Sequence, residues 1–429
     1  MGSGILRGRI LHCIDTPGAD GAGVEYLEDG VLQFEDGVIT LLADAREASA
    51  GGLQLGDVPH LGAGLIVPGF IDTHVHAPQL AILGSYGEQL MAWLERYTFP
   101  AEARFADPDY AAAAMDEFLG EMLRHGTTSA LVFSTSHEDA TEALFTAARA
   151  RDLRLVAGKV LMDRNAPQGL LDTAASGEAA SRRLIERWHG AGRLAYAVTP
   201  RFSITCSDEQ LAAAGRLLRD YPGVYLQTHL AENPGEIAAV AELFPDAAHY
   251  LDTYDRHGLC GERSFFAHCV HLQPDELERL AATDSRVSLC PSSNMFLGSG
   301  LYDWAQLERE GVCISLGSDV GAGTSLSMLR TLGDAYRVCQ LQEMSLPPMQ
   351  GLYAVTLGNA RALGVAERIG NLAVGSEADF LVLDPAGNPQ VQRRLQDVSD
   401  IDEEWFVYMM LGDERLVAST WVAGREVVR

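Results

Sequence analysis

Between residue 65 and about residue 364, short apolar runs alternate with longer amphipathic stretches. The apolar runs are rich in branched residues, which is typical of strands buried in a parallel sheet. Eight such runs occur, at residues 65–72, 127–133, 154–162, 194–199, 224–229, 264–268, 286–290 and 312–318. Helical patterns lie between them, most clearly at residues 110–124, 138–151, 178–188 and 208–219. Eight strands with intervening helices over roughly 300 residues predict a TIM (β/α)8 barrel.

The two ends of the chain have a different pattern, made of short alternating segments. Asp29-Gly30 and Asp36-Gly37 separate such segments near the N-terminus, as hairpin turns do. A similar β-pattern returns in the tail at residues 379–384 and 420–428. Because chain termini often lie close together, we predict a single small β-sandwich module built from both ends. The expected boundaries are residues 1–66 and 370–429 for this module and residues 67–369 for the barrel.

The composition and net charge of the chain exclude several classes of protein. Of the 429 residues, 47% are hydrophobic, which is ample for a core. No apolar run reaches the roughly 18 residues that a membrane span needs, and the N-terminus lacks the layout of a secretory signal, so we expect a cytoplasmic protein without membrane contact. The net charge of −27 repels phosphate backbones, so nucleic acid is not an expected partner. The seven cysteines are widely spaced and predict no disulfide framework.

Candidate chemistry begins with His74 and His76, which follow the first apolar run. Side chains alternate in a strand, so these two imidazoles can point the same way and meet one metal ion. A lone H-x-H pair is more often two ordinary loop histidines. However, three other predicted strands also end in metal-capable or proton-transferring residues, namely His229, His268 and Asp319. Strand ends of a barrel meet on one face, so this agreement predicts a metal-dependent active site.

These motifs resemble the amidohydrolase superfamily, and several blocks resemble its guanine deaminase family. The superfamily pattern is P-G-F-I-D-T-H-x-H at residues 68–76, followed by the strand-end histidines and aspartate. The narrower likeness lies in H-x-x-Q at residues 76–79, P-R-F at residues 200–202 and S-N-M-F-L-G-S-G at residues 293–300. Ala77 departs from it, because an aromatic residue is expected there. The resemblance implies hydrolytic deamination of guanine to xanthine and ammonia by a metal-bound hydroxide, in purine catabolism or salvage.

A catalytic zinc needs neutral imidazoles, a carboxylate and one open position for water. The candidate ligands are His74, His76, His229 and Asp319. We expect one Zn²⁺ per chain, although Fe²⁺ also suits such ligands. Asp319 could take the proton of the water while binding the metal, and His268 could orient the hydroxide. Glu232, three residues beyond His229, is placed to protonate a ring nitrogen and to carry a proton to the departing ammonia.

The resemblance also implies a set of substrate-binding residues. Arg201 would donate to the purine carbonyl, Phe202 would pack on the ring face, and Gln79 would hydrogen-bond the purine edge beside Glu232. Members with two metals usually bridge them through a modified lysine at the end of the fourth strand. Lys159, the single lysine of the chain, lies in the third predicted strand, so we expect one metal and a structural lysine. The resemblance further implies a homodimer.

Two alternatives remain open at this point. One is a related amidohydrolase that deaminates another purine, a pyrimidine or a triazine, which the residues expected to bind the base would decide. The other, from a different class, is a non-catalytic barrel that binds a purine. A zinc deaminase of unrelated architecture would carry H-x-E and P-C-x-x-C motifs, and neither occurs in the chain.

Overall fold

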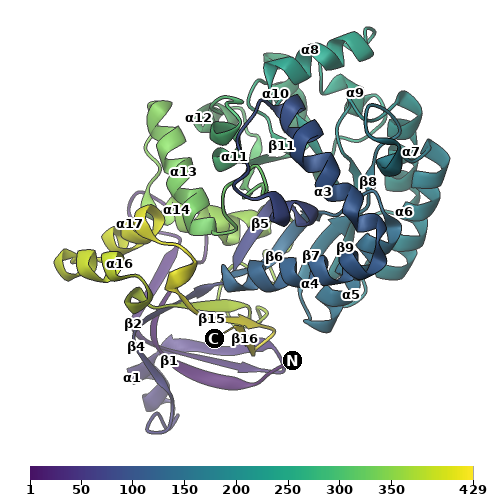
Figure 1. Cartoon of the computed structure of the whole chain (residues 1–429). Helices are drawn as coiled ribbons and strands as arrows, with labels where there is room; N and C mark the ends of the chain where they lie inside the picture. Colours follow the sequence, from purple (N-terminus) through teal and green to yellow (C-terminus); the bar gives the residue numbers. More distant parts are fainter. Residues whose placement is uncertain (429) are drawn as a thin grey trace.

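The computed structural model describes residues 1–428 and confirms a parallel barrel beside a β-module made from both chain ends (Figure 1). Eight barrel strands follow the order β13-β12-β11-β10-β9-β7-β6-β5, and the short β8 pairs with β9. The barrel strands are β5 (Phe70–His76), β6 (Thr127–Phe133), β7 (Arg154–Gly158), β8 (Val160–Leu161), β9 (Leu194–Pro200), β10 (Tyr225–Leu230), β11 (Ser264–His268), β12 (Arg286–Leu289) and β13 (Cys313–Leu316). Their carboxyl ends share one face, where the predicted site residues lie.

Helix α4 (Pro108–Arg124) illustrates how the sequence produces the outer ring of helices. Asp107 caps its N-terminus by accepting from the backbone N–H of Asp109 at 2.9 Å, and Pro108 suits the first turn because it needs no N–H partner there. Its buried residues recur every three or four positions, at Ala111, Met115, Phe118, Leu119, Met122 and Leu123. The prediction at 110–124 is therefore confirmed to within two residues at the start.

The other helices associated with the barrel are α2 (Leu90–Trp93), α3 (Phe99–Ala103), α5 (Glu138–Ala150), α6 (Ala174–Trp188), α7 (Asp208–Asp220), α8 (Pro234–Leu243), α9 (Asp252–Asp255), α10 (Pro274–Ala282), α11 (Pro291–Phe296), α12 (Trp304–Arg309), α13 (Met328–Leu341), α14 (Pro348–Val355) and α15 (Leu357–Ala362). Among residues 1–428, no helix is both long enough and apolar enough to span a membrane.

The β-module is a seven-stranded sheet in the order β16-β15-β14-β4-β1-β2-β3. Its strands are β1 (Gly4–Cys13), β2 (Val24–Glu35), β3 (Val38–Asp44), β4 (His60–Pro68), β14 (Phe380–Leu383), β15 (Val417–Val422) and β16 (Arg425–Val428), with α1 (Ala45–Ala50) after β3. Phe34 of β2 contacts Phe380 and Trp421, with ring centroids 5.5 and 5.7 Å apart. Strands from the two ends of the chain thus share one apolar core, and Figure 1 shows the two termini close together.

The structure divides two of the predicted strands, and the run at 154–162 forms β7 and β8 with a break at Lys159. The run at 65–72 changes sheets at Gly69, because β4 ends in the module at Pro68 and β5 starts in the barrel at Phe70. Both halves are buried and apolar, so the pattern alone carried no signal for the change. The tail also contains two helices that the β-pattern did not predict, α16 (Pro389–Arg394) and α17 (Ile401–Leu411). Helix α17 packs on α13 and α14 beside the barrel.

Asn359 of α15 joins the first and last strands of the barrel. Its side-chain amide donates to the backbone oxygens of Ile71 at 2.7 Å and Leu316 at 2.9 Å, and its carbonyl accepts from the N–H of Leu316 at 2.9 Å. The side chain is fully buried. Asn359 therefore satisfies three backbone polar groups of β5 and β13, the two barrel strands that do not pair with each other.

We expect Asn359→Ala to lower the free energy of unfolding by about 3 kcal/mol or more, because each buried unpaired polar group costs about 1–3 kcal/mol. Urea denaturation of the purified protein measures this loss. Asn371→Ala, in a half-buried turn, is the matched control and should cost much less. A loss of less than about 1 kcal/mol for Asn359→Ala would contradict the assignment.

Candidate active site and metal centre

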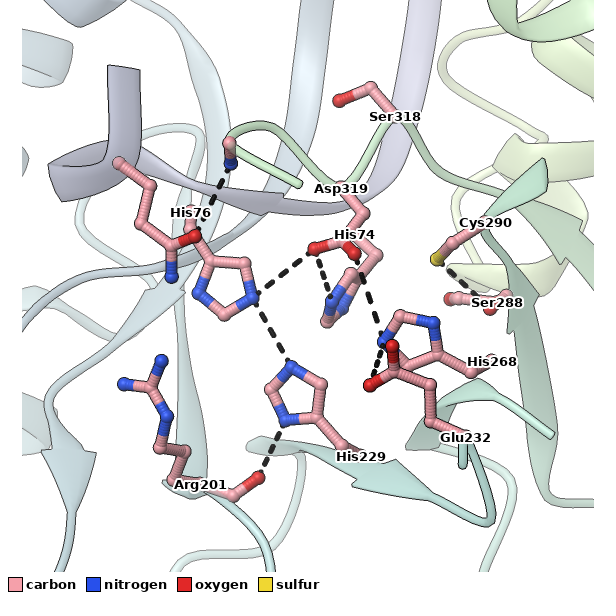
Figure 2. Close-up of polar contacts among 12 residues, drawn as sticks. His74, His76, Arg201, His229, Glu232, His268, Ser288, Cys290, Ser318 and Asp319 are labelled. Carbon is pink, nitrogen blue, oxygen red and sulfur yellow. Dashed lines mark hydrogen bonds and ion pairs between the residues drawn. The ribbon is translucent and has the colours of Figure 1, made fainter. Parts of the chain in front are cut away.

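The four predicted metal ligands converge at the carboxyl end of the barrel. His74 and His76 belong to β5, His229 belongs to β10, and Asp319 lies three residues beyond β13. Nε2 of His76 lies 3.2 Å from Nε2 of His229 (Figure 2). Oδ1 of Asp319 lies 3.3 Å from Nε2 of His74 and 3.4 Å from Nε2 of His76. Side chains from three separate strand ends therefore present their donor atoms to a common point.

These distances fit a single metal ion. Ligand atoms held tetrahedrally at about 2.0–2.1 Å from zinc lie about 3.3–3.4 Å apart. Nε2 of His74 is buried and has no hydrogen-bond partner within residues 1–428, which a bound cation would explain. Nδ1 of His229 donates to the backbone oxygen of Arg201 at 2.7 Å, which leaves Nε2 as the unprotonated nitrogen facing the site.

The protonation states of the cluster also suit a cation. Burial lowers the pKa of His76 and of His229 well below the ordinary histidine value, so both imidazoles are neutral at neutral pH. Burial by itself would raise the pKa of Asp319, but the adjacent imidazole of His74, whose Nε2 lies 3.3 Å away, outweighs burial and holds that pKa well below its usual range. Neutral imidazoles beside an ionised carboxylate form the donor set that zinc prefers.

Glu232 and His268 form a second group beside the first. Nε2 of His268 lies 3.5 Å from Oε2 of Glu232 and 3.8 Å from Oδ2 of Asp319. Figure 2 draws both contacts as dashed lines. Nδ1 of His268 donates to the side-chain oxygen of Asn294 at 2.8 Å, and Ser299 donates to Glu232 at 3.0 Å. Burial raises the pKa of Glu232 to about 7. Burial lowers the pKa of His268, but the carboxylates of Glu232 and Asp319 outweigh this and raise it.

The backbone is strained at His268 and at Asp319. His268 has φ 72° and Asp319 has φ 51°, in the left-handed region that non-glycine residues rarely adopt. Such strain, of about 1–3 kcal/mol per residue, persists only where surrounding contacts impose it and concentrates at functional sites. Gly317 allows the close approach of the last strand, because a Cβ there would lie 2.6 Å from Cβ of His74. The local conformation therefore directs both side chains into the site.

A cavity opens beside the cluster. Gln79, Arg201 and Phe202 line it together with Glu232 and His268, so the structure brings all the predicted substrate-binding residues into one space. Its apolar wall comes from residues the sequence analysis did not assign, namely Leu90, Trp93, Leu94 and Leu297. A mostly apolar cavity with a few convergent polar groups is typical of a small-molecule site.

Comparison with known proteins agrees with this geometry. Residues 65–427 match the sequence profile of the amidohydrolase family. The chain belongs to the amidohydrolase family. The guanine deaminase of Escherichia coli (strain K12) is 45% identical to this amidohydrolase over 421 residues, covering 97% of this chain and 95% of the relative. The solved structure of E. coli guanine deaminase matches with a TM-score of 0.96 and 44% identity over 99% of both chains. A guanine deaminase structure from C. acetobutylicum, with guanine bound in its active site, has a TM-score of 0.89 and 27% identity over 100% of both chains.

Two residues of this amidohydrolase, Cys290 and Glu102, lie closer to the site residues than their positions in the sequence indicated. Cys290 lies at the end of an apolar run, and its sulfur falls within 4.8 Å of ligand atoms of His74, His268 and Asp319. Burial raises the pKa of the Cys290 thiol well above its ordinary value, so the thiolate needed for metal binding is disfavoured. Glu102 contacts both Arg201 and Gln79, although no motif surrounds it. The position of Cys290 at the end of an apolar run was a weak sequence signal, whereas no sequence feature pointed to Glu102.

Two other residues lie outside the cavity lining. Lys159 is buried between β7 and β8 and forms an ion pair with Asp172. Ala77, where an aromatic side chain was expected, is buried in the 3₁₀ segment Ala77–Ile82 and lines a separate pocket that also includes Phe105 and Tyr110. The missing aromatic ring therefore leaves the cavity wall intact.

Proposed function

We propose that this amidohydrolase is a guanine deaminase, converting guanine and water to xanthine and ammonia. The observation that carries the proposal is the shared cavity, in which hydrogen-bonding groups for a purine lie beside a cluster suited to hydrolysis. The full-length likeness to guanine deaminases supports the choice of substrate over other purines, pyrimidines or triazines. Glu232, His268 and Asp319 together favour an enzyme over a barrel that merely binds a purine.

One metal ion completes the proposed site, as Zn²⁺ or Fe²⁺. The proposed ligands are His74, His76, His229 and Asp319. When bound, such an ion supplies a Lewis acid that lowers the pKa of water toward neutrality. The strand ends set the spacing of these side chains, whose donor atoms lie 3.2–3.4 Å apart.

Proton transfers are assigned to the groups beside the ligands. Asp319 remains ionised and accepts a proton from the attacking water, while His268 orients the water through its Nε2. Glu232, with a pKa of about 7, donates a proton to a ring nitrogen and then carries one to the leaving amine. Attack at the ring carbon bearing the exocyclic amine forms a carbon–oxygen bond, breaks the carbon–nitrogen bond and releases ammonia.

Guanine recognition is assigned to three side chains. Arg201 donates to the purine carbonyl, Gln79 hydrogen-bonds the purine edge, and Phe202 packs on the ring face. A buried donor that meets no acceptor is costly, so a site of this kind discriminates strongly against a base with an amine in place of the carbonyl. Incubation of the metal-loaded protein with guanine, adenine, cytosine and 8-oxoguanine, with ammonia release as the readout, tests the proposal. Release from a non-guanine base alone would reject guanine as the substrate and keep the chemistry.

We expect one metal ion per chain. A bridging lysine at the end of the fourth strand would be needed for a second ion in the usual binuclear arrangement, and Thr199, Pro200 and Arg201 stand there instead. Elemental analysis of purified, active protein should give a metal-to-chain ratio near one. A ratio near two, with both ions required for activity, would contradict this expectation.

We further propose a cytoplasmic homodimer. The support is the resemblance to guanine deaminases. Light scattering on the purified protein should give twice the chain mass of 46.3 kDa. A monomer mass would reject the dimer, and fractionation of the source cells that finds the activity outside the cytoplasm would reject the location.

A further inference from the structure

Glu102 connects two side chains proposed to bind the substrate. It lies on α3 and has no solvent exposure. Nη1 of Arg201 donates to both carboxylate oxygens, at 2.9 and 2.8 Å, and Nε2 of Gln79 donates to Oε1 at 3.3 Å. These partners come from the ends of two different barrel strands, so one buried carboxylate sets their relative position.

The contacts of Arg201 and Gln79 with Glu102 leave hydrogen-bonding groups of these two side chains available to a ligand. Within residues 1–428, the other N–H groups of the Arg201 guanidinium donate to no acceptor, although the side chain is buried and lines the cavity. Oε1 of Gln79 accepts from the N–H of Gly321 at 3.3 Å, so contacts at both ends determine which way its amide points. Each side chain is thus oriented by protein contacts on one side and faces the cavity on the other.

Charge gives Glu102 a second effect. Arg201 places a full positive charge in a buried pocket, and isolated buried charge is costly unless it is paired. Pairing with Glu102 makes the Arg201–Glu102 pair neutral overall, which matches a neutral purine such as guanine. Xanthine is a stronger acid than guanine and becomes anionic at mildly alkaline pH. An uncompensated Arg201 would therefore favour the anionic product over the substrate.

We propose that Glu102 is a positioning residue that orients Arg201 and Gln79 toward the purine and, by neutralising Arg201, disfavours binding of the anionic product. The proposal rests on the proposed guanine deaminase activity. Glu102 does not line the cavity and so acts through its two partners.

Glu102→Gln tests both effects. Glutamine offers one acceptor oxygen in place of two, so Nη1 of Arg201 loses one of its two contacts, and the substitution also removes the negative charge. We expect kcat/KM for guanine to fall by about 10- to 100-fold, because misplaced binding groups have effects of this size, and metal content to be unchanged. At a pH where xanthine is anionic, inhibition by xanthine relative to the KM for guanine should become several-fold stronger than in the parent.

Two variants separate these effects from a general loss of stability. Glu102→Asp keeps the charge but shortens the side chain, so it should lower kcat/KM without strengthening inhibition by xanthine. Glu404→Gln disrupts another poorly exposed carboxylate–arginine pair, with Arg9 at 3.0 Å, on α17 and away from the cavity. It should lower thermal stability while leaving kcat/KM near that of the parent.

The possible results distinguish failure of the proposed function from failure of the proposed role of Glu102. If the parent protein releases no ammonia from guanine, the proposed function fails. If the parent is active and Glu102→Gln retains kcat/KM within about twofold, or changes it no more than Glu404→Gln does, the role of Glu102 is rejected. If Glu102→Gln does not fold, Glu102→Asp decides the positioning role by the same comparison.

Discussion

Glu232→Gln is expected to abolish turnover of guanine while leaving the metal content nearly unchanged. Glu232 lies within the cavity, 3.5 Å from His268, and burial raises its pKa to about 7. A group with such a pKa can both give and take a proton near neutral pH, and positioned acid–base groups contribute about 10²- to 10⁴-fold to rate. Glutamine keeps the shape and the hydrogen bond from Ser299 but cannot exchange a proton.

Single-turnover kinetics and elemental analysis of the same preparation measure the two expected results for Glu232→Gln. Glu276→Gln is the matched control, because Glu276 is also buried but accepts from the backbone N–H groups of Leu251 and Gln273 outside the cavity. The control should retain most of its activity. Retention of most activity by Glu232→Gln would remove Glu232 from the mechanism, and loss of metal would reassign it to the metal site.

Arg201→Ala is expected to lower kcat/KM for guanine far more than it lowers metal occupancy. The guanidinium is assigned to the purine carbonyl, and a hydrogen bond from a charged donor contributes about 1.5–3 kcal/mol, or roughly 10- to 150-fold. The backbone oxygen of Arg201, which orients His229, remains in the variant. Steady-state kinetics with guanine and elemental analysis measure both quantities.

Arg201→Ala is also expected to lower the stability of the folded protein, because it leaves Glu102 buried without its cation. Breaking a buried ion pair on one side typically costs about 3–5 kcal/mol. The double variant Arg201→Ala/Glu102→Gln removes both charges and should recover much of that stability without recovering turnover. If the double variant regained the kcat/KM of the parent, Arg201 would have no direct part in recognising guanine.

Much of the fold could be read from the sequence, since buried parallel strands and amphipathic helices leave strong periodic signals. The strands 127–133 and 264–268 were predicted with the bounds that the structure shows. The change of sheet at Gly69 could not be predicted, because β4 and β5 are equally apolar and only their neighbours in space differ. Helix α17 was missed for a related reason, as its acidic residues all lie in the first turn and the rest of the helix is apolar, so no polar face runs along it.

By itself, the sequence determined the barrel, the two-ended module and the set of side chains that meet at the strand ends. Those inferences follow from local rules, because strand alternation orients His74 and His76 and every parallel strand of a barrel ends on the same face. Only the tertiary structure decided what surrounds these groups, including the pairing of Arg201 and Gln79 with Glu102. The physical reason is that burial, charge pairing and pKa depend on contacts between segments that are distant in sequence, and no local pattern records them.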